Sequence, residues 1–156
     1  MISVLFVCLG NICRSPMAEG VFKRILEREG CTADFHIDSA GLHDYHRGEL
    51  PDERMRRHAE SRGYCLIHRS RPVTKEDFEI FDHIIGMDSY NMKALARMAA
   101  GDAQRKKLHS MTDFCSRHKA KEVPDPYYGG AAGFEYVIDL LEDACEGLFK
   151  TILPHQ

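Results

Sequence analysis

The chain lacks any apolar run approaching the ~20 residues that a helix needs to cross a membrane. It also lacks the basic region and cleavage site of a signal peptide, because Met1 leads directly into the first apolar residues. A surplus of basic residues is missing too, since the formal net charge is −3, and this argues against a nucleic-acid-binding surface. We therefore expect neither a membrane nor a nucleic acid as partner.

Internal repeats, low-complexity tracts and linker-like segments are also absent. With 156 residues, of which 44% are hydrophobic and 29% charged, the composition is that of one domain spanning residues 1–156. The six cysteines are scattered through a chain with enough apolar residues to fold without disulfides. We therefore expect reduced thiols and a cytoplasmic location, with Cys31, Cys65 and Cys145 packed among other residues.

A metal site is suggested by only one pair of residues. Cys115 and His118 have a C-x-x-H spacing, but no second pair with zinc-like spacing accompanies them. We expect no metal and no other cofactor.

Strand-like and helix-like segments alternate along the chain. Short β-branched and aromatic runs predict strands, and apolar residues at helical spacing predict helices. The strands are expected at residues 2–7, 35–40 and 83–87, and the helices at 16–29, 51–62, 75–81, 89–99 and around 134–148. Residues 101–121 are basic and poorly periodic, and Leu108 is the one hint of a last strand there. This alternation favours an α/β fold with a parallel sheet covered by helices on both faces.

The most informative stretch runs from Cys8 to Pro16, between the first strand and the first helix. A strand, a tight loop and a helix in this order aim several backbone N–H groups at one point and form an anion site. A thiolate at Cys8 would be stabilised by these amides and by Arg14, whose planar fork can hold two phosphate oxygens. Ser15 can donate a hydrogen bond toward Cys8. The alternative, that Cys8 is only a small buried hydrophobe, is less consistent with the Cys-x5-Arg-Ser spacing.

A second candidate group lies late in the chain, in Val123-Pro124-Asp125-Pro126-Tyr127-Tyr128-Gly129-Gly130. Two prolines stiffen the backbone on either side of Asp125, so its carboxyl is presented from a rigid loop. Phosphate chemistry at Cys8 needs an acid to protonate the departing oxygen, and Asp125 can serve. Alone, an Asp-Pro pair is more often a simple turn.

Together, the Cys8–Pro16 loop and the late Asp-Pro-Tyr-Tyr resemble the signature motifs of the low-molecular-weight protein tyrosine phosphatases. Further matches occur at residues 38–41, His68, Arg71 and Asp88, so the resemblance covers nearly the whole chain. It implies a three-layer, doubly wound fold of flavodoxin-like type, with a four-stranded parallel sheet in the order 2-1-3-4. In such sheets, ligands bind beyond the carboxyl ends of the strands.

The resemblance also implies roles for individual residues. The catalytic residues would be Cys8 as nucleophile, Arg14 as phosphate clamp and Asp125 as general acid. Residues expected to bind phosphate or line the substrate slot are Leu9, Gly10, Asn11, Ile12, Cys13, Ser15, Tyr45, Tyr127 and Tyr128. Ser39 and His68 would support Asn11 in a left-handed conformation, and Asp88 would cap a helix and orient Arg14 or the loop. Cys13 is either a packing residue or, as the resemblance favours, a disulfide partner for Cys8 on oxidation.

These roles predict metal-independent hydrolysis of phosphotyrosine proteins or small aryl phosphates through a cysteinyl-phosphate, with inorganic phosphate as product. The chain is expected to be a monomer or a weak homodimer. Protein-arginine phosphatases of this fold resemble this loop but have threonine where Ile12 stands. A thioredoxin-coupled arsenate reductase would need further cysteines near residues 82–90, where the sequence has none. An inactive phosphate-binding module is the third alternative, and the presence of Cys8, Arg14 and Asp125 together argues against it.

Overall fold

The computed structural model describes residues 1–153 and contains one parallel four-stranded sheet with the order β2-β1-β3-β4. The strands are β1 (Ile2–Cys8), β2 (Phe35–Gly41), β3 (His83–Gly86) and β4 (Leu108–Ser110). Strand β1 lies in the centre and is paired along its length with β2, from Ile2 opposite Phe35 to Cys8 opposite Gly41. The sheet order implied by the family resemblance is confirmed.

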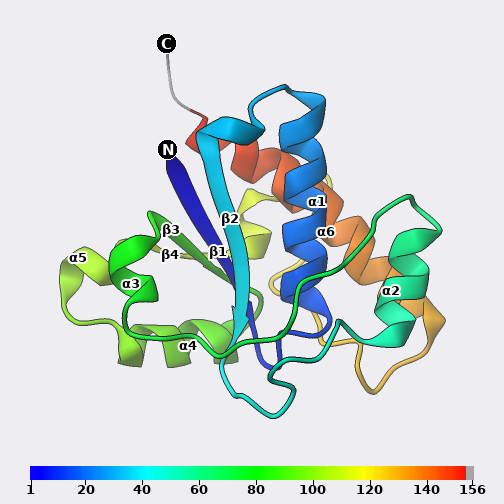
Figure 1. The fold of residues 1–156 in the computed structure, drawn as a ribbon, viewed down its shortest axis with the longest axis horizontal. Helices are drawn as coiled ribbons and strands as arrows, with labels where there is room; N and C mark the ends of the chain where they lie inside the picture. The colour runs from blue at the N-terminus through cyan, green and yellow to red at the C-terminus, as the bar shows by residue number, and fades with distance from the viewer. Residues whose placement is uncertain (154–156) are drawn as a thin grey trace.

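Helices cover both faces of this sheet (Figure 1). Helices α1, α2 and α6 lie on one side, and α3, α4 and α5 lie on the other. Their bounds are α1 (Arg14–Arg28), α2 (Glu53–Glu60), α3 (Asp77–Ile80), α4 (Ser89–Met98), α5 (Asp102–Arg105) and α6 (Ala131–Ile152). Two short 3-10 turns, η1 (Thr32–Asp34) and η2 (Met111–Phe114), complete the elements.

The core is divided by the sheet into two layers. The larger layer joins β1 to α1 and α6, and its aromatic side chains Phe6, Phe22, Phe35 and Phe149 pack with ring centroids 5.8–6.3 Å apart. The smaller layer joins the other face of β1 and β3 to α3 and α4. Side chains of β1 therefore contribute to both layers, which is why the strand is a continuous apolar run rather than an alternating one.

Most expected elements are present, with shifts at their ends. Helix α2 begins after Asp52, not at Pro51, because the Asp52 carboxylate accepts hydrogen bonds from the Arg54 and Met55 amides and caps the helix. Asp88 caps α4 as expected, in a capping box with Asn91. Residues 101–121 hold the short helix α5, which was not expected, followed by the strand that Leu108 suggested.

One expectation about packing is wrong. Cys145 is buried and Cys31 is half-buried, but Cys65 is exposed, since it lies in the irregular segment after α2 rather than on an element that faces the core.

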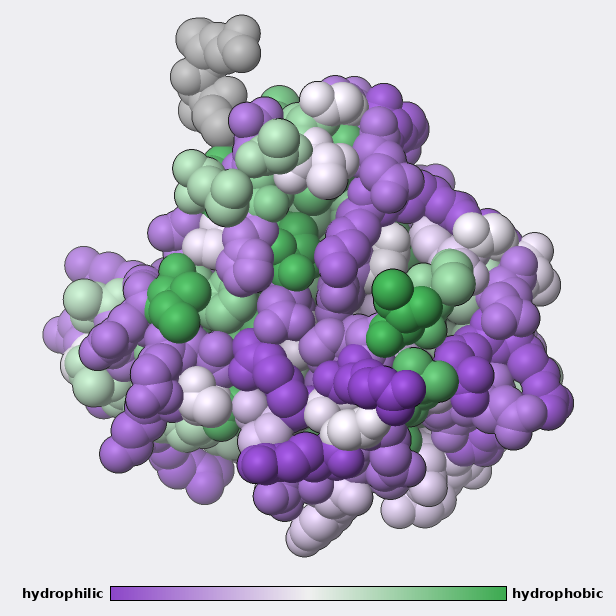
Figure 2. All heavy atoms as spheres, in the orientation of Figure 1, coloured by the Kyte–Doolittle hydropathy of each residue, from purple (hydrophilic) through white to green (hydrophobic). Residues whose placement is uncertain are grey.

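Polar residues dominate the face drawn in Figure 2, on which hydrophobic residues gather only in small separate patches. Among residues 1–153, no helix is both long and apolar enough to span a membrane.

The carboxyl ends of β1 and β2 come together at the lower edge of the sheet in Figure 1. There, the end of β2 touches the loop that follows β1. A Cβ atom added to Gly41 would lie 3.0 Å from the backbone of Gly10 and Leu9, so only glycine permits this contact without displacing the loop. The fold thus brings the end of β2 into contact with the loop that follows β1.

Candidate active site

The loop from Leu9 to Cys13 turns its carbonyl groups outward. The Leu9 carbonyl accepts hydrogen bonds from the Leu42 and His43 amides, and those of Gly10 and Ile12 accept from the Ser70 hydroxyl and the Asp52 amide. In contrast, no backbone N–H group of residues 9–15 donates to a protein acceptor within residues 1–153. These amides, together with the N-terminus of α1, form a nest with a positive potential that suits a phosphate-sized anion.

Asn11 fixes the shape of this loop. It is fully buried and has a φ of 59°, the one non-glycine residue of the described chain in the left-handed region. Its side-chain amide donates to the hydroxyls of Ser15 (2.8 Å) and Ser39 (3.0 Å). Its carbonyl oxygen accepts from His68 Nε2 (2.9 Å) and the Arg71 amide (3.0 Å). Four hydrogen bonds thus hold a conformation that is otherwise unfavourable for a residue with a side chain.

The sulfur of Cys8 lies beneath the loop, 3.0 Å from the Ser15 hydroxyl oxygen. Because Asn11 donates to this same oxygen, the single Ser15 hydroxyl proton points away from Asn11. Two acceptors are within reach of this proton, namely the Cys8 sulfur and the Ala40 carbonyl oxygen, which is more distant at 3.4 Å. The geometry therefore favours a hydroxyl that donates to sulfur, and such a bond stabilises a thiolate.

Arg14 is only 2% exposed, and its guanidinium is held by Asp88 and by the Val123 backbone. Its Nη1 donates to Asp88 (2.6 Å) and to the Val123 carbonyl (3.0 Å). Burial opposes its charge, but the neighbouring Cys8, Asp88 and Asp125 outweigh this effect and raise the pKa of Arg14 above its usual value. Arg14 is thus a fixed positive charge whose remaining N–H groups are available to a ligand.

Burial has the opposite consequence for the second cysteine of the loop. It raises the pKa of the Cys13 thiol, and the nearby Asp52, Cys8 and Asp125 raise it further. Cys13 therefore stays a neutral thiol at physiological pH.

Asp125 reaches the same site from the loop before α6. Its carboxylate lies 3.5 Å from Arg14 Nη2, and its other oxygen accepts the Tyr127 amide at 3.0 Å. Arg54 of α2 donates to the Tyr127 carbonyl at 2.8 Å and also packs over the Tyr127 ring. Both contacts anchor the Asp125 loop to α2. The position of the Asp125 carboxylate is therefore set by contacts on both sides of the loop.

A cleft of about 430 Å³ opens above the nest. Cys8, only 3% exposed, lies at its floor. The cleft walls are lined by Leu9, Gly10, Ile12, Cys13, Arg14, His43, Tyr45, His46, Tyr90, Asp125, Tyr127 and Tyr128. His43 and Tyr45 stack with ring centroids 4.1 Å apart on one wall, and Tyr127 and Tyr128 meet edge to face at 5.0 Å on the other. A deep slot with aromatic walls suits a flat aromatic phosphate ester.

The structure brings the predicted site residues together in two layers. The cleft lining includes all of them except Asn11, Ser15 and the three residues expected to support the loop. Asn11 and Ser15 have side chains directed away from the cleft, so they contribute their backbone amides and the hydrogen-bonded frame described above. Ser39 and His68 contact Asn11 and Asp88 contacts Arg14, which is the arrangement that was expected.

Other residues at the site were missed by the sequence reasoning. His43, His46 and Tyr90 line the cleft, and Arg54 fastens the Asp125 loop. The one signal for Tyr90 was its place at the start of the helix that Asp88 caps, shortly after β3 ends beside β1.

Comparison with known proteins identifies the family of the chain. A family model described as low molecular weight phosphotyrosine protein phosphatase matches residues 3–155. The chain belongs to this family. The phosphatase is 41% identical over 152 residues to the low molecular weight phosphotyrosine protein phosphatase of Schizosaccharomyces pombe, covering 97% of both chains. Its fold superposes on the crystal structure of a protein tyrosine phosphatase from Entamoeba histolytica with a TM-score of 0.95, at 47% identity and 97% coverage of both chains.

A more distant likeness concerns another substrate. The phosphatase also resembles a Drosophila arginine phosphatase, with 30% identity, a TM-score of 0.90, and coverage of 98% of this chain and 99% of that one. The fold alone therefore does not identify the substrate of this chain.

Proposed function

We propose that this phosphatase hydrolyses phosphotyrosine through a cysteinyl-phosphate intermediate, with Cys8 as nucleophile, Arg14 as phosphate clamp and Asp125 as general acid and base. The observation that carries this proposal is the convergence of unpaired amides, the Arg14 fork and the Cys8 sulfur in one cleft, with Asp125 3.5 Å from that fork. Each group alone has an ordinary structural explanation, but together they supply every part that the reaction needs.

In the first step, the Cys8 thiolate attacks phosphorus while the bond from phosphorus to the phenolic oxygen breaks. The amides of residues 9–15 and Arg14 hold the three non-bridging oxygens, where the transferred charge is concentrated. Protonated Asp125 gives its proton to the departing phenolic oxygen. The products of this step are a neutral tyrosine side chain, a phosphorylated Cys8 and an Asp125 carboxylate.

In the second step, water attacks the phosphorus of the intermediate. The Asp125 carboxylate takes the proton from this water, and the phosphorus–sulfur bond breaks. The electron pair returns to Cys8 as a thiolate, which the Ser15 hydroxyl is placed to stabilise. Inorganic phosphate leaves, and Asp125 is again protonated for the next cycle.

The depth of the cleft supports phosphotyrosine over phosphoserine as substrate. A nucleophile at the floor of the slot is reached by a long, flat ring, whereas the short serine side chain would bring peptide backbone against the walls. Six of the wall residues are apolar or tyrosine side chains suited to such a ring, namely Leu9, Ile12, Tyr45, Tyr90, Tyr127 and Tyr128. Ile12 also supports a phosphotyrosine substrate over phosphoarginine, because its side chain offers no hydroxyl to the guanidinium group.

One catalytic domain spanning residues 1–156 is part of the proposal. It is supported by the distribution of the site, since residues of the first loop, of α4 and of the loop before α6 all line one cleft. The lining residues run from Cys8 to Tyr128, so the cleft is built from segments far apart in the sequence.

The test compares leaving groups in two variants. Cys8→Ser should abolish turnover while the protein still binds phosphate, because the amides and Arg14 remain. Asp125→Ala should lose about 10²–10⁴-fold in kcat on substrates with poor leaving groups, and less on those with good ones that leave without a proton. Equal losses on both substrate classes would contradict the assignment of Asp125 as the acid.

The substrate class is tested with the wild-type protein. Peptides carrying phosphotyrosine, phosphoserine or phosphoarginine are compared, with vanadate as inhibitor and with a chelator present to test metal independence. The proposal expects preference for phosphotyrosine, inhibition by vanadate and no loss with chelator. Preference for phosphoarginine would instead place the chain with the arginine phosphatases.

A further inference from the structure

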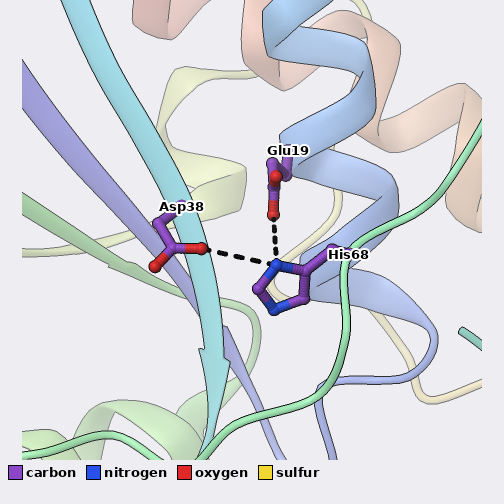
Figure 3. A group of neighbouring side chains, drawn as sticks. All are labelled: Glu19, Asp38 and His68. Carbon is purple, nitrogen blue, oxygen red and sulfur yellow. Dashed lines mark ion pairs between the residues drawn. The ribbon is translucent and has the colours of Figure 1, made fainter. Parts of the chain in front are cut away.

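Behind the catalytic loop, a histidine and two carboxylates converge on one point (Figure 3). Glu19 comes from α1, Asp38 from β2, and His68 from the segment between α2 and α3. His68 Nδ1 points between the two carboxylates and lies 3.4 Å from Glu19 Oε1 and 3.4 Å from Asp38 Oδ1. It is the one group of three potential metal ligands within residues 1–153 whose donor atoms lie within 4.8 Å of one another.

These contacts are not good hydrogen bonds. An N–H···O bond is about 2.7–3.2 Å long, and both distances exceed this range. Within residues 1–153, neither His68 Nδ1 nor Asp38 Oδ1 forms a hydrogen bond, although both belong to residues that are otherwise well bonded. His68 Nδ1 and Asp38 Oδ1 thus lie within ion-pair distance of each other, but neither has a hydrogen-bond partner in the described part of the chain.

The two nitrogen–oxygen distances in this cluster match those of a tetrahedral zinc site. With zinc–nitrogen and zinc–oxygen bonds of about 2.0–2.2 Å, neighbouring ligands of a tetrahedron lie about 3.3–3.5 Å apart. The observed nitrogen–oxygen distances are both 3.4 Å. We propose that Glu19, Asp38 and His68 bind a divalent transition metal of the zinc class, with solvent as the fourth ligand. One imidazole and two carboxylates favour such a metal over Mg²⁺, which prefers oxygen ligands alone.

The surroundings hold the three ligands in the orientation that a metal needs. Metal-binding histidines usually donate their second N–H to a fixed acceptor, and His68 Nε2 has Asn11 Oδ1 at 2.9 Å. The outer oxygen of Glu19 pairs with Lys23 at 2.6 Å, and that of Asp38 accepts from Arg71 at 3.0 Å. Both carboxylates therefore keep their inner oxygens turned toward His68.

The inner oxygen of Glu19 also accepts a hydrogen bond from Ser39 at 2.7 Å, and Ser39 is itself bonded to Asn11. The proposed site is thus joined to the catalytic loop by two routes, through His68 and through Ser39. A metal can enter from a surface groove of about 300 Å³ that Glu19 and His68 line. The side chains are 7% and 14% exposed, so the site is partly buried and still open to solvent.

Zinc chloride is the probe for this site, and calorimetric titration of the full chain is the first measurement. The protein carries Cys8→Ser and Cys13→Ser so that the thiols of the catalytic loop do not bind the metal. We expect one zinc ion per chain and little heat with magnesium chloride. Asp38→Asn should weaken zinc binding by about tenfold or more. Glu135→Gln is the matched control, because it removes a carboxylate from another histidine pair, with His58, and should leave the affinity unchanged.

A second measurement needs no change at the site. In the chain labelled with ¹⁵N-histidine, zinc should shift the Nδ1 resonance of His68, and the Nε2 proton should remain attached. An equal affinity in the Asp38→Asn protein would overturn the proposal. So would a zinc-induced shift confined to His43 and His46 of the catalytic cleft, or equal binding of Mg²⁺.

Discussion

Replacing Asn11 by alanine separates the catalytic loop from the frame that holds it. The buried amide makes four hydrogen bonds, and the variant leaves two donors, His68 Nε2 and the Arg71 amide, without their acceptor. Each buried unsatisfied donor costs about 1–3 kcal/mol. The left-handed backbone at φ 59° costs alanine a further ~1–2 kcal/mol. The hydroxyls of Ser15 and Ser39 can rotate toward other acceptors, so they add little.

The sum predicts a loss of roughly 3–8 kcal/mol in the free energy of unfolding, measured by urea denaturation. Asn11→Gly is the matched variant, because glycine removes the same hydrogen bonds but accepts φ 59° without strain. It should be more stable than Asn11→Ala by about 1 kcal/mol.

Activity should fall in both variants. The loop amides are no longer held in one geometry, so kcat is expected to fall more than stability alone explains, in assays well below the unfolding transition. An Asn11→Ala protein within 1 kcal/mol of wild type, or a glycine variant no more stable than the alanine one, would refute this reasoning.

Three further variants test other parts of the structure. Gly41→Ala places a methyl group 3.0 Å from the backbone of Leu9 and Gly10. It should lower kcat about tenfold or more and reduce phosphate affinity in parallel. An unchanged kcat would show that the loop can move aside without losing its function. Tyr90→Ala removes a cleft wall and should raise KM for a phosphotyrosine peptide several-fold. Tyr136→Ala is the control, because Tyr136 lies on α6 outside the cleft, and it should leave KM unchanged. Equal KM values in the two variants would contradict the assignment. Asp143→Asn should cost about 2–4 kcal/mol in urea unfolding at pH 7, because an amide N–H₂ would face backbone donors. Burial alone would raise the pKa of Asp143, but hydrogen bonds from Ser116, His118 and Arg117 hold this pKa well below its usual range. The contribution of Asp143 to the free energy of unfolding is therefore complete above the unfolded-state pKa near 4, and it is lost as the pH falls toward the folded-state pKa. The asparagine variant should therefore lose less stability than wild type between pH 5 and pH 2, and an identical acid limb would contradict this.

The sequence could predict those parts of the molecule that depend on local pattern. The strand before Cys8, the Asp88 cap of α4 and the apolar stripe of α6 are each encoded within one segment, so periodicity and capping chemistry suffice. Helix α5 was missed because its four residues have no apolar face from which to recognise it. The start of α2 was misplaced because Pro51 and Asp52 are both good helix starts, and only the hydrogen bonds of Asp52 decide between them.

The catalytic site could be predicted only in those parts that lie close together in the sequence. Cys8, Arg14 and Ser15 are close in sequence, and their spacing alone indicates a phosphate loop. The contribution of Arg54 was hidden, because its hydrogen bond to Tyr127 spans 73 residues and an arginine on an exposed helix face has no sequence signal. Tyr90 was hidden for a similar reason, since it enters the cleft only because β3 ends beside β1 in the sheet.

The same distinction explains why the sequence indicated no metal. The spacing of metal motifs reports ligands within one element, whereas Glu19 lies on a helix, Asp38 on a strand and His68 in a loop, and the three meet only after the sheet has formed. The cluster also lies next to Asn11, the residue whose backbone shapes the phosphate nest. A frame that must hold Asn11 in a costly conformation needs a rigid acceptor and donor set around it, and carboxylates directed at a histidine provide one. The geometry that stabilises the catalytic loop is therefore the same geometry that suits a metal ion, and zinc titration distinguishes a frame that only pairs charges from one that also binds a cation.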